Sequence, residues 1–183
     1  MTANEFIARW KGSAGAELAN SQSFLVELCQ LLDVPCPDPT IADEDQNTYT
    51  FEKKVTFHNG DGTTSNGRVD LYRQSCFVLE SKQGSERRDA EQAEALATVT
   101  KAKQKKARQG TAKRGTSAWQ LAMRKARNQA ERYAKALPEW PPFLIVTDVG
   151  HCFDLYADFS GSGKLYLPFP DPQSFRVPLE RLA

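Results

Sequence analysis

The chain of 183 residues is 40% hydrophobic and 26% charged, and its formal net charge is +1. A chain of this length and composition buries one sizeable core, so we expect a single domain over residues 1–183. The sequence excludes a membrane span, which needs roughly 18 apolar residues in a row. Its N-terminus also carries no apolar run typical of a signal peptide. We therefore expect a cytoplasmic protein without membrane contact.

The first half of the chain predicts one helix and three antiparallel strands. Leucines at helical spacing predict the helix within residues 14–37, where Pro35 and Pro37 end it. The turn formers of residues 58–67 predict a long hairpin loop between the first two strands. The three strands, rich in β-branched and aromatic residues, cover residues 49–57, 68–73 and 76–82.

The second half predicts two helices and two more strands. Residues 85–109 are helical in composition but poor in large apolar residues, so we expect a surface helix there. The next helix, residues 118–137, aligns one face made of Trp119, Ala122, Ala126, Gln129, Tyr133 and Leu137.

Residues 143–148 form the most apolar run and predict a central strand, with residues 151–158 as its neighbour. Turns and prolines follow, and the chain stops where a further helix could begin. This element order predicts an α/β domain with a central mixed sheet flanked by helices. The abrupt end leads us to expect the N-terminal part of a longer polypeptide.

Basic residues are concentrated in one region. Residues 95–130 contain no acid, and the stretch from Lys101 to Lys135 holds 12 of the 24 basic residues against the single acid Glu131. Such a stretch indicates a polyanion partner, most simply nucleic acid. From charge alone, a solvated surface helix explains it equally well.

Histidine and cysteine offer little for catalysis. The chain has only two histidines, His58 and His151, too few for a histidine-rich metal site. Its four cysteines show neither the pairing of a zinc site nor the density of a disulfide scaffold, so we expect reduced thiols. These are Cys29, Cys36, Cys76 and Cys152. The composition favours chemistry performed by carboxylates and lysine.

Charged residues interrupt two of the predicted strands. Asp70 lies in the second strand, and Glu80 and Lys82 lie on one face of the third. If these strands are neighbours, Asp70 lies beside Glu80, and two adjacent carboxylates favour a cation such as Mg²⁺ between them. Lys82 would then reach the attacking water and the phosphate. The sequence thus predicts metal-assisted phosphodiester hydrolysis, although an edge-strand ion pair with Lys82 is a structural alternative.

Alternation along the second strand places Asp70 on the face opposite to Val69 and Leu71. On the helix of residues 118–137, Gln129 and Tyr133 are four residues apart and share a face that is otherwise apolar. One interpretation is that both side chains reach the active centre or the DNA. The other is that Gln129 is a core glutamine whose hydrogen bonds are satisfied and Tyr133 a tyrosine with a solvated hydroxyl.

These residues resemble the PD-(D/E)xK nuclease superfamily, with Asp70 and the Glu80-Ser81-Lys82 triplet in its motif. Gln129 and Tyr133 resemble the QxxxY element of its RecB-like branch. More closely, the segments "WKGSAGAELANSQSFLVELCQLLDVPCP", "YTFEKKV", "GRVDLYRQSCFVLESKQG" and "QAERYAKALPEWPPFLIVTDVG" resemble the N-terminal part of MmeI-like type IIL restriction-modification proteins.

The resemblance implies a restriction-endonuclease-like fold and a Mg²⁺-dependent, site-specific deoxyribonuclease domain acting on double-stranded DNA. It also implies a parent polypeptide with an adenine-N6 methyltransferase that uses S-adenosylmethionine and a target-recognition domain. The present residues contain no methyl-donor loop or NPPY-type motif. We expect a monomer that dimerises transiently on DNA.

Carried onto this sequence, Asp70, Glu80 and the carbonyl of Ser81 would hold magnesium, and Lys82 would assist the water. Glu17 is an auxiliary candidate, with an ordinary helix acid as the alternative. Val69 stands where the superfamily usually has proline, which the MmeI-like family tolerates.

The basic stretch is assigned to sequence-independent contact with DNA phosphates. Its residues are Lys101, Lys103, Lys105, Lys106, Arg108, Lys113 and Arg114. Two other functions stay open, namely a catalytically silent DNA-binding scaffold of a phage-defence methyltransferase and a standalone RecB-like exonuclease.

Overall fold

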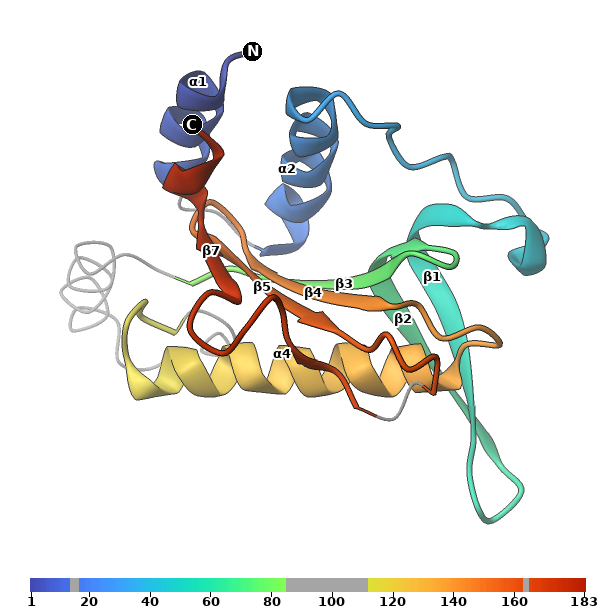
Figure 1. Ribbon diagram of the computed structural model, residues 1–183. Helices are drawn as coiled ribbons and strands as arrows, with labels where there is room; N and C mark the ends of the chain where they lie inside the picture. The colour runs from blue at the N-terminus through green and yellow to red at the C-terminus, as the bar shows by residue number, and fades with distance from the viewer. Residues whose placement is uncertain (14–16, 85–111, 163–164) are drawn as a thin grey trace, which may run out of the picture.

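The computed structural model describes residues 1–13, 17–84, 112–162 and 165–183. Over these residues a mixed sheet is covered by α1 and α2 on one face and by α4 on the other (Figure 1). The helices are α1 (Ala3–Lys11), α2 (Glu17–Leu31) and α4 (Ser117–Ala136), with 3₁₀ turns η1 (Glu44–Gln46) and η2 (Leu179–Leu182).

The strands are β1 (Tyr49–His58), β2 (Thr64–Arg73), β3 (Phe77–Lys82), β4 (Phe143–Asp148), β5 (Cys152–Ala157), β6 (Leu167–Pro168) and β7 (Arg176–Pro178). They pair in the order β1-β2-β3-β4-β5-β6, and β7 also pairs with β5. Only β3 and β4 run parallel among these pairs, which the crossover through α4 makes possible. The fold is therefore the expected α/β arrangement with a mixed sheet.

Two hydrophobic cores fill the two sides of the sheet. On one side Trp119, Ala126 and Tyr133 of α4 pack on β2 to β5, as the helical spacing predicts. On the other side Phe6 and Phe24, which stack at 5.3 Å, pack against β3 and β5. β3 is buried from both sides, which is why charged residues on it stand out.

Several predicted boundaries were wrong. Helix α1 was not predicted, although Thr2 and Glu5 form a capping box at its start. β2 begins at Thr64, within the predicted loop, because the hairpin pairing extends to the His58–Thr64 pair. The C-terminal residues add β6, β7 and a 3₁₀ turn where turns and a helix start were expected. The helix predicted over residues 85–109 lies outside the described residues.

Along β1 and β2, side chains stop alternating between the two faces of the sheet at one pair of opposed residues. The register pairs Phe51 with Leu71 and Lys53 with Val69, so Glu52 lies across from Asp70. Val69 belongs to the core beneath α4, whereas Leu71 belongs to the core beneath α1 and α2. The expectation that both lie on one face was therefore wrong. Glu52 has φ 54°, a left-handed backbone that L residues rarely adopt, and this locates the break.

Gly150, between β4 and β5, should tolerate no side chain. Its φ is 76°, and a methyl group there would overlap the carbonyl oxygen of Trp10. We expect Gly150→Ala to lower the free energy of unfolding by roughly 2–4 kcal/mol, measured by urea denaturation. Gly60→Ala is the control, since a Cβ there meets no atom within 4 Å, and an equal effect of both changes would contradict the prediction.

Candidate active site

Asp70 lies where β2 separates from β3. The pairing of the two strands ends at Leu71 and Leu79. Two residues beyond Leu79, the Ser81 N–H donates to the Asp70 carboxylate (Oδ2) at 2.6 Å. The side chain thus satisfies a backbone donor of the neighbouring strand. This contact fixes the Asp70 carboxylate beside the Glu80-Ser81-Lys82 triplet, as the sequence analysis predicted.

Glu80 is a charged residue in the core beneath α4. It is 2% exposed, and its Oε1 accepts hydrogen bonds from Gln129 Nε2 at 2.5 Å and from Lys82 Nζ at 3.2 Å. Gln129 Nε2 also lies 3.3 Å from the hydroxyl of Tyr133. The structure therefore joins the two auxiliary candidates on α4 to the predicted catalytic triplet.

Lys82 is the accessible member of this group. Its side chain is 27% exposed, and Nζ donates to the Ser81 carbonyl at 2.7 Å as well as to Glu80. The ammonium thus already binds two of the three predicted magnesium ligands. The Lys82–Glu80 contact is the ion pair that the structural alternative predicts, and it also places a positive charge beside two of the predicted magnesium ligands.

The donor set matches a hard divalent ion. Asp70 and Glu80 supply carboxylate oxygens and Ser81 supplies a carbonyl oxygen, all ligands that magnesium takes together with water. Across the described ranges no group of three histidine, cysteine or acidic residues could hold a metal. The predicted magnesium site would therefore have two carboxylates and one carbonyl as its protein donors.

Burial affects the protonation of Asp70. It raises the pKa of this carboxyl above its ordinary value, and the Ser81 N–H and the Lys82 ammonium offset part of the rise. Burial and the nearby Asp70 carboxylate likewise raise the pKa of Glu52, while Arg68 lowers it. Without a bound cation, the ionised Asp70 and Glu52 carboxylates therefore destabilise the folded state.

This destabilisation predicts the effect of Asp70→Asn on stability. Because the folded pKa of Asp70 lies above its unfolded value, the ionised carboxyl destabilises the fold as pH rises through that folded pKa. Asparagine stays uncharged and can still accept from Ser81. We expect Asp70→Asn to raise Tm at pH 7 in EDTA, measured by circular dichroism.

The gain should vanish below pH ~3.9, where the wild-type carboxyl is protonated in both states. Asp61→Asn should act in the opposite direction at pH 7, since hydrogen bonds from Thr63 lower the pKa of Asp61. A pH-independent gain for Asp70→Asn would contradict the electrostatic cause.

Arg114 differs from its predicted role as a DNA contact. Its guanidinium lies 3.0 Å from Asp148 through both Nε and Nη2, and the Asp148 side chain is fully buried. Asp148 also accepts from Gly84 N–H and from the Trp119 indole, each at 2.8 Å. Arg114 is thus an internal structural residue, because its charge compensates a buried carboxylate.

The other predicted DNA contacts are mostly untested by the structure. Lys113 is half-buried, and the five from Lys101 to Arg108 lie outside the described residues. Glu17 begins α2, but its side chain also lies outside the description. These assignments stay predictions.

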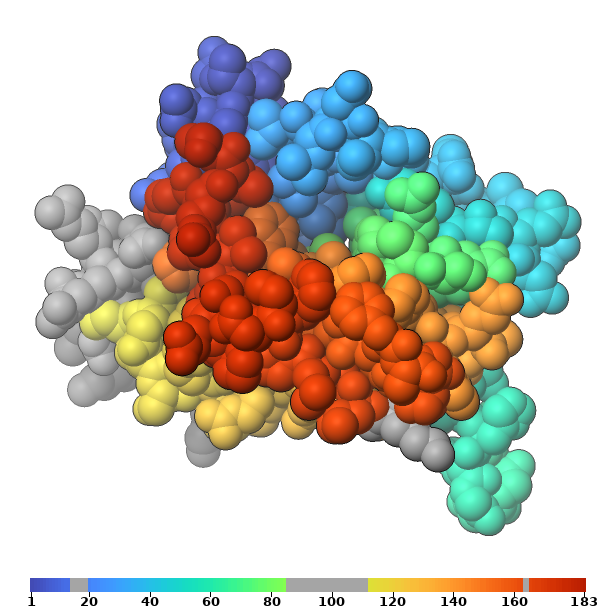
Figure 2. Space-filling view, in the orientation of Figure 1, coloured from blue at the N-terminus to red at the C-terminus, as the bar shows by residue number. Residues whose placement is uncertain are grey.

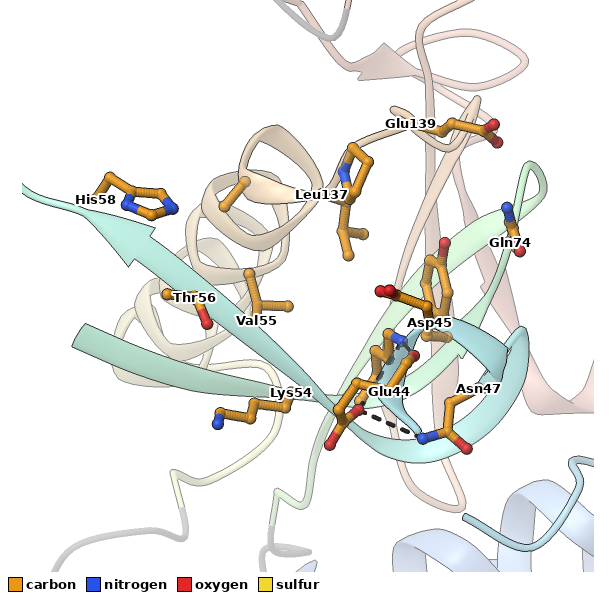
Figure 3. A pocket seen from close by; sticks show the side chains of 14 residues that line it. Glu44, Asp45, Asn47, Lys54, Val55, Thr56, His58, Gln74, Leu137 and Glu139 are labelled. Carbon is orange, nitrogen blue, oxygen red and sulfur yellow. Dashed lines mark hydrogen bonds and ion pairs between the residues drawn. The ribbon is translucent and has the colours of Figure 1, made fainter. Parts of the chain in front are cut away.

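A separate hollow of about 490 Å³ opens between η1, the second half of β1 and the C-terminal end of α4 (Figure 3). Its lining includes Glu44, Lys54, His58 and Leu137. Neither Asp70 nor Glu80 is among the lining residues, so the hollow is distinct from the carboxylate centre.

Two residues around the site were missed from the sequence. Glu52 looks like any exposed acid in a strand, and only the register shows that it opposes Asp70. Asp148 ends a predicted central strand, and an acid at the end of such an apolar strand is the signal that could have identified it. The pairing of Lys82 with Asp148 between β3 and β4 places this buried charge next to the active centre.

The fold and the site define an α/β domain in which Asp70 accepts from the Ser81 N–H and Glu80 pairs with Lys82 where β2 and β3 separate. A comparison with protein families matches residues 1–183 to the family described as "MmeI, N-terminal domain". The chain belongs to this family, which confirms the resemblance to MmeI-like proteins and indicates a domain of a restriction-modification enzyme. Comparisons with curated proteins and with solved structures found no significant match. The described residues contain no helix long and apolar enough to span a membrane.

Proposed function

We propose that the chain is a Mg²⁺-dependent DNA endonuclease domain of the PD-(D/E)xK type. The observation that carries the proposal is the Lys82 ammonium held by the Glu80 carboxylate and the Ser81 carbonyl, next to Asp70. The match to the MmeI N-terminal family, which covers residues 1–183, also supports the proposal.

Each of these residues would have a separate role in phosphodiester hydrolysis. Asp70, Glu80 and the Ser81 carbonyl would hold magnesium, which supplies a Lewis acid that polarises the scissile phosphate. Lys82, with its partly exposed side chain, would orient or deprotonate the attacking water and stabilise charge on the phosphate. Gln129 would be a positioning residue, because its amide donates to one oxygen of Glu80.

The proposed substrate is double-stranded DNA, and the proposed setting is a longer polypeptide. In that setting a methyltransferase using S-adenosylmethionine and a target-recognition domain supply modification and sequence specificity. A monomer that pairs transiently on DNA would cut both strands, since one centre hydrolyses one bond at a time. A silent DNA-binding scaffold is the second candidate, and it predicts DNA binding without metal-dependent cleavage.

Metal binding tests the centre without requiring turnover. Mg²⁺ should raise the Tm of the wild-type chain, because a ligand that binds only the folded state stabilises it. Asp70→Asn and Glu80→Gln should each reduce that shift, and Asp61→Asn in the hairpin loop should leave it unchanged. Equal Mg²⁺ shifts in all four proteins would contradict the assignment of these ligands.

A further inference from the structure

The outer side of α4 carries a net positive charge, because the helix has several basic residues and a single acid. Glu131 is the only acid of this helix, and it lies 2.7 Å from both Arg127 and Lys135. The remaining basic residues of the helix, Arg124, Lys125 and Arg132, are exposed.

Arg132 is held in place by aromatic rings. Its guanidinium lies 4.8 Å from the ring centre of Phe57 on β1 and 5.8 Å from that of Tyr133. Arg132 forms no ion pair with any residue that the structure describes. The rings hold this exposed guanidinium at the surface of α4, and a guanidinium binds phosphate through its N–H groups.

The same contacts connect Arg132 to the carboxylate centre. Phe57 and Tyr133 stack at 5.7 Å, and Gly67 of β2 lies so close that a Cβ there would be 2.5 Å from the Tyr133 ring. The Tyr133 hydroxyl contacts Gln129, and Gln129 donates to Glu80. Arg132 thus lies at the outer end of a packed series of residues that ends at the site.

The β1–β2 hairpin lies next to Arg132 through Phe57. The β1–β2 hairpin runs past α4, and its tip projects beyond the helix (Figure 1). In the space-filling view the hairpin protrudes from the body of the molecule (Figure 2). On the hairpin, Lys54 and Arg68 are exposed and oppose each other in the register, so no acid lies across from either.

We propose that Arg132 and Lys125 form a phosphate-binding ridge on α4 that holds the DNA backbone beside the carboxylate centre. Lys125 lies seven residues before Arg132, on the same side of the helix and roughly 10 Å away. The ridge offers charge and a planar arginine fork with no groups arranged to read bases, so its contacts are independent of sequence. The inference rests on the proposed function, and it names two residues of the basic stretch that are not among the phosphate contacts predicted from the sequence.

The test is the affinity of the 183-residue chain for a fluorescent DNA duplex, measured by anisotropy in EDTA so that no strand is cut. Arg132→Ala should weaken binding about tenfold and lower the salt slope by about 1. Arg132→Lys should weaken it less, since the charge remains while the stacked fork is lost. Lys135→Ala removes the same charge from the same helix, but from a residue paired with Glu131, and should change the affinity less than about twofold.

Equal affinity of wild type and Arg132→Ala, or equal losses in Arg132→Ala and Lys135→Ala, would overturn the ridge. Polyglutamate that competes as well as DNA would overturn DNA as the ligand. These outcomes are separable from the nuclease proposal. Binding through Arg132 without Mg²⁺-dependent cleavage upholds the ridge alone, whereas cleavage with unchanged Arg132→Ala binding upholds the nuclease alone.

Discussion

Replacing Lys82 with alanine should lower the single-turnover rate of DNA cleavage by roughly 10²- to 10⁴-fold, the usual loss when a general acid or base is removed. The ammonium of Lys82 is the partly exposed cation of the site, held by Glu80 and the Ser81 carbonyl. No other lysine of the described residues lies within ion-pair distance of Glu80.

Lys82→Gln distinguishes charge from hydrogen bonding, because glutamine can donate to the same oxygens but carries neither charge nor a transferable proton. Both variants should keep the circular dichroism spectrum of the wild type, since Glu80 retains the hydrogen bond from Gln129. Cleavage by Lys82→Gln at the wild-type rate would remove Lys82 from the catalytic residues.

Replacing Asp148 with alanine should lower the free energy of unfolding by roughly 3–5 kcal/mol, the cost of leaving a buried partner charge uncompensated. The Asp148 side chain is fully buried, and it accepts from Arg114, Gly84 and Trp119. Removing it would leave the Arg114 guanidinium and two further donors without this acceptor.

Urea denaturation measures this loss. Asp45→Ala on the exposed η1 turn is the control, expected within about 0.5 kcal/mol of the wild type. Asp148→Asn should lower the free energy of unfolding by an amount between those of Asp45→Ala and Asp148→Ala. Its amide oxygen can still accept from Trp119 or Gly84, but the ion pair with Arg114 is lost. An effect of Asp148→Ala no larger than that of Asp45→Ala would contradict the structural role given to this ion pair.

Local pattern explains which parts of the fold were predictable. The strands around Asp70 and Glu80 have clear β-branched and aromatic composition, and period-two alternation correctly placed Glu80 and Lys82 on one face of β3. The helical spacing of Trp119, Ala126 and Tyr133 correctly gave the buried face of α4. The capping box of α1 was also a local signal, and it was overlooked.

The remaining features depend on contacts between distant residues. The face change at Asp70 accompanies the left-handed backbone of Glu52 on the opposite strand, which alternation within one strand cannot reveal. Arg114 looked like part of a basic stretch, and its partner Asp148 is 34 residues away. Arg132 gains its position from Phe57, which reaches it only through the packing of the hairpin on α4.

The most direct test of the central claim is conversion of supercoiled plasmid to nicked and linear DNA by the wild-type chain and by Asp70→Asn. The account predicts cleavage by the wild type in Mg²⁺, none in EDTA, and none by Asp70→Asn, whose fold should be at least as stable. Cleavage that persists in EDTA or in Asp70→Asn would contradict the carboxylate centre. A wild-type chain that neither cleaves the plasmid nor gains stability from Mg²⁺ would contradict the nuclease and favour the silent scaffold.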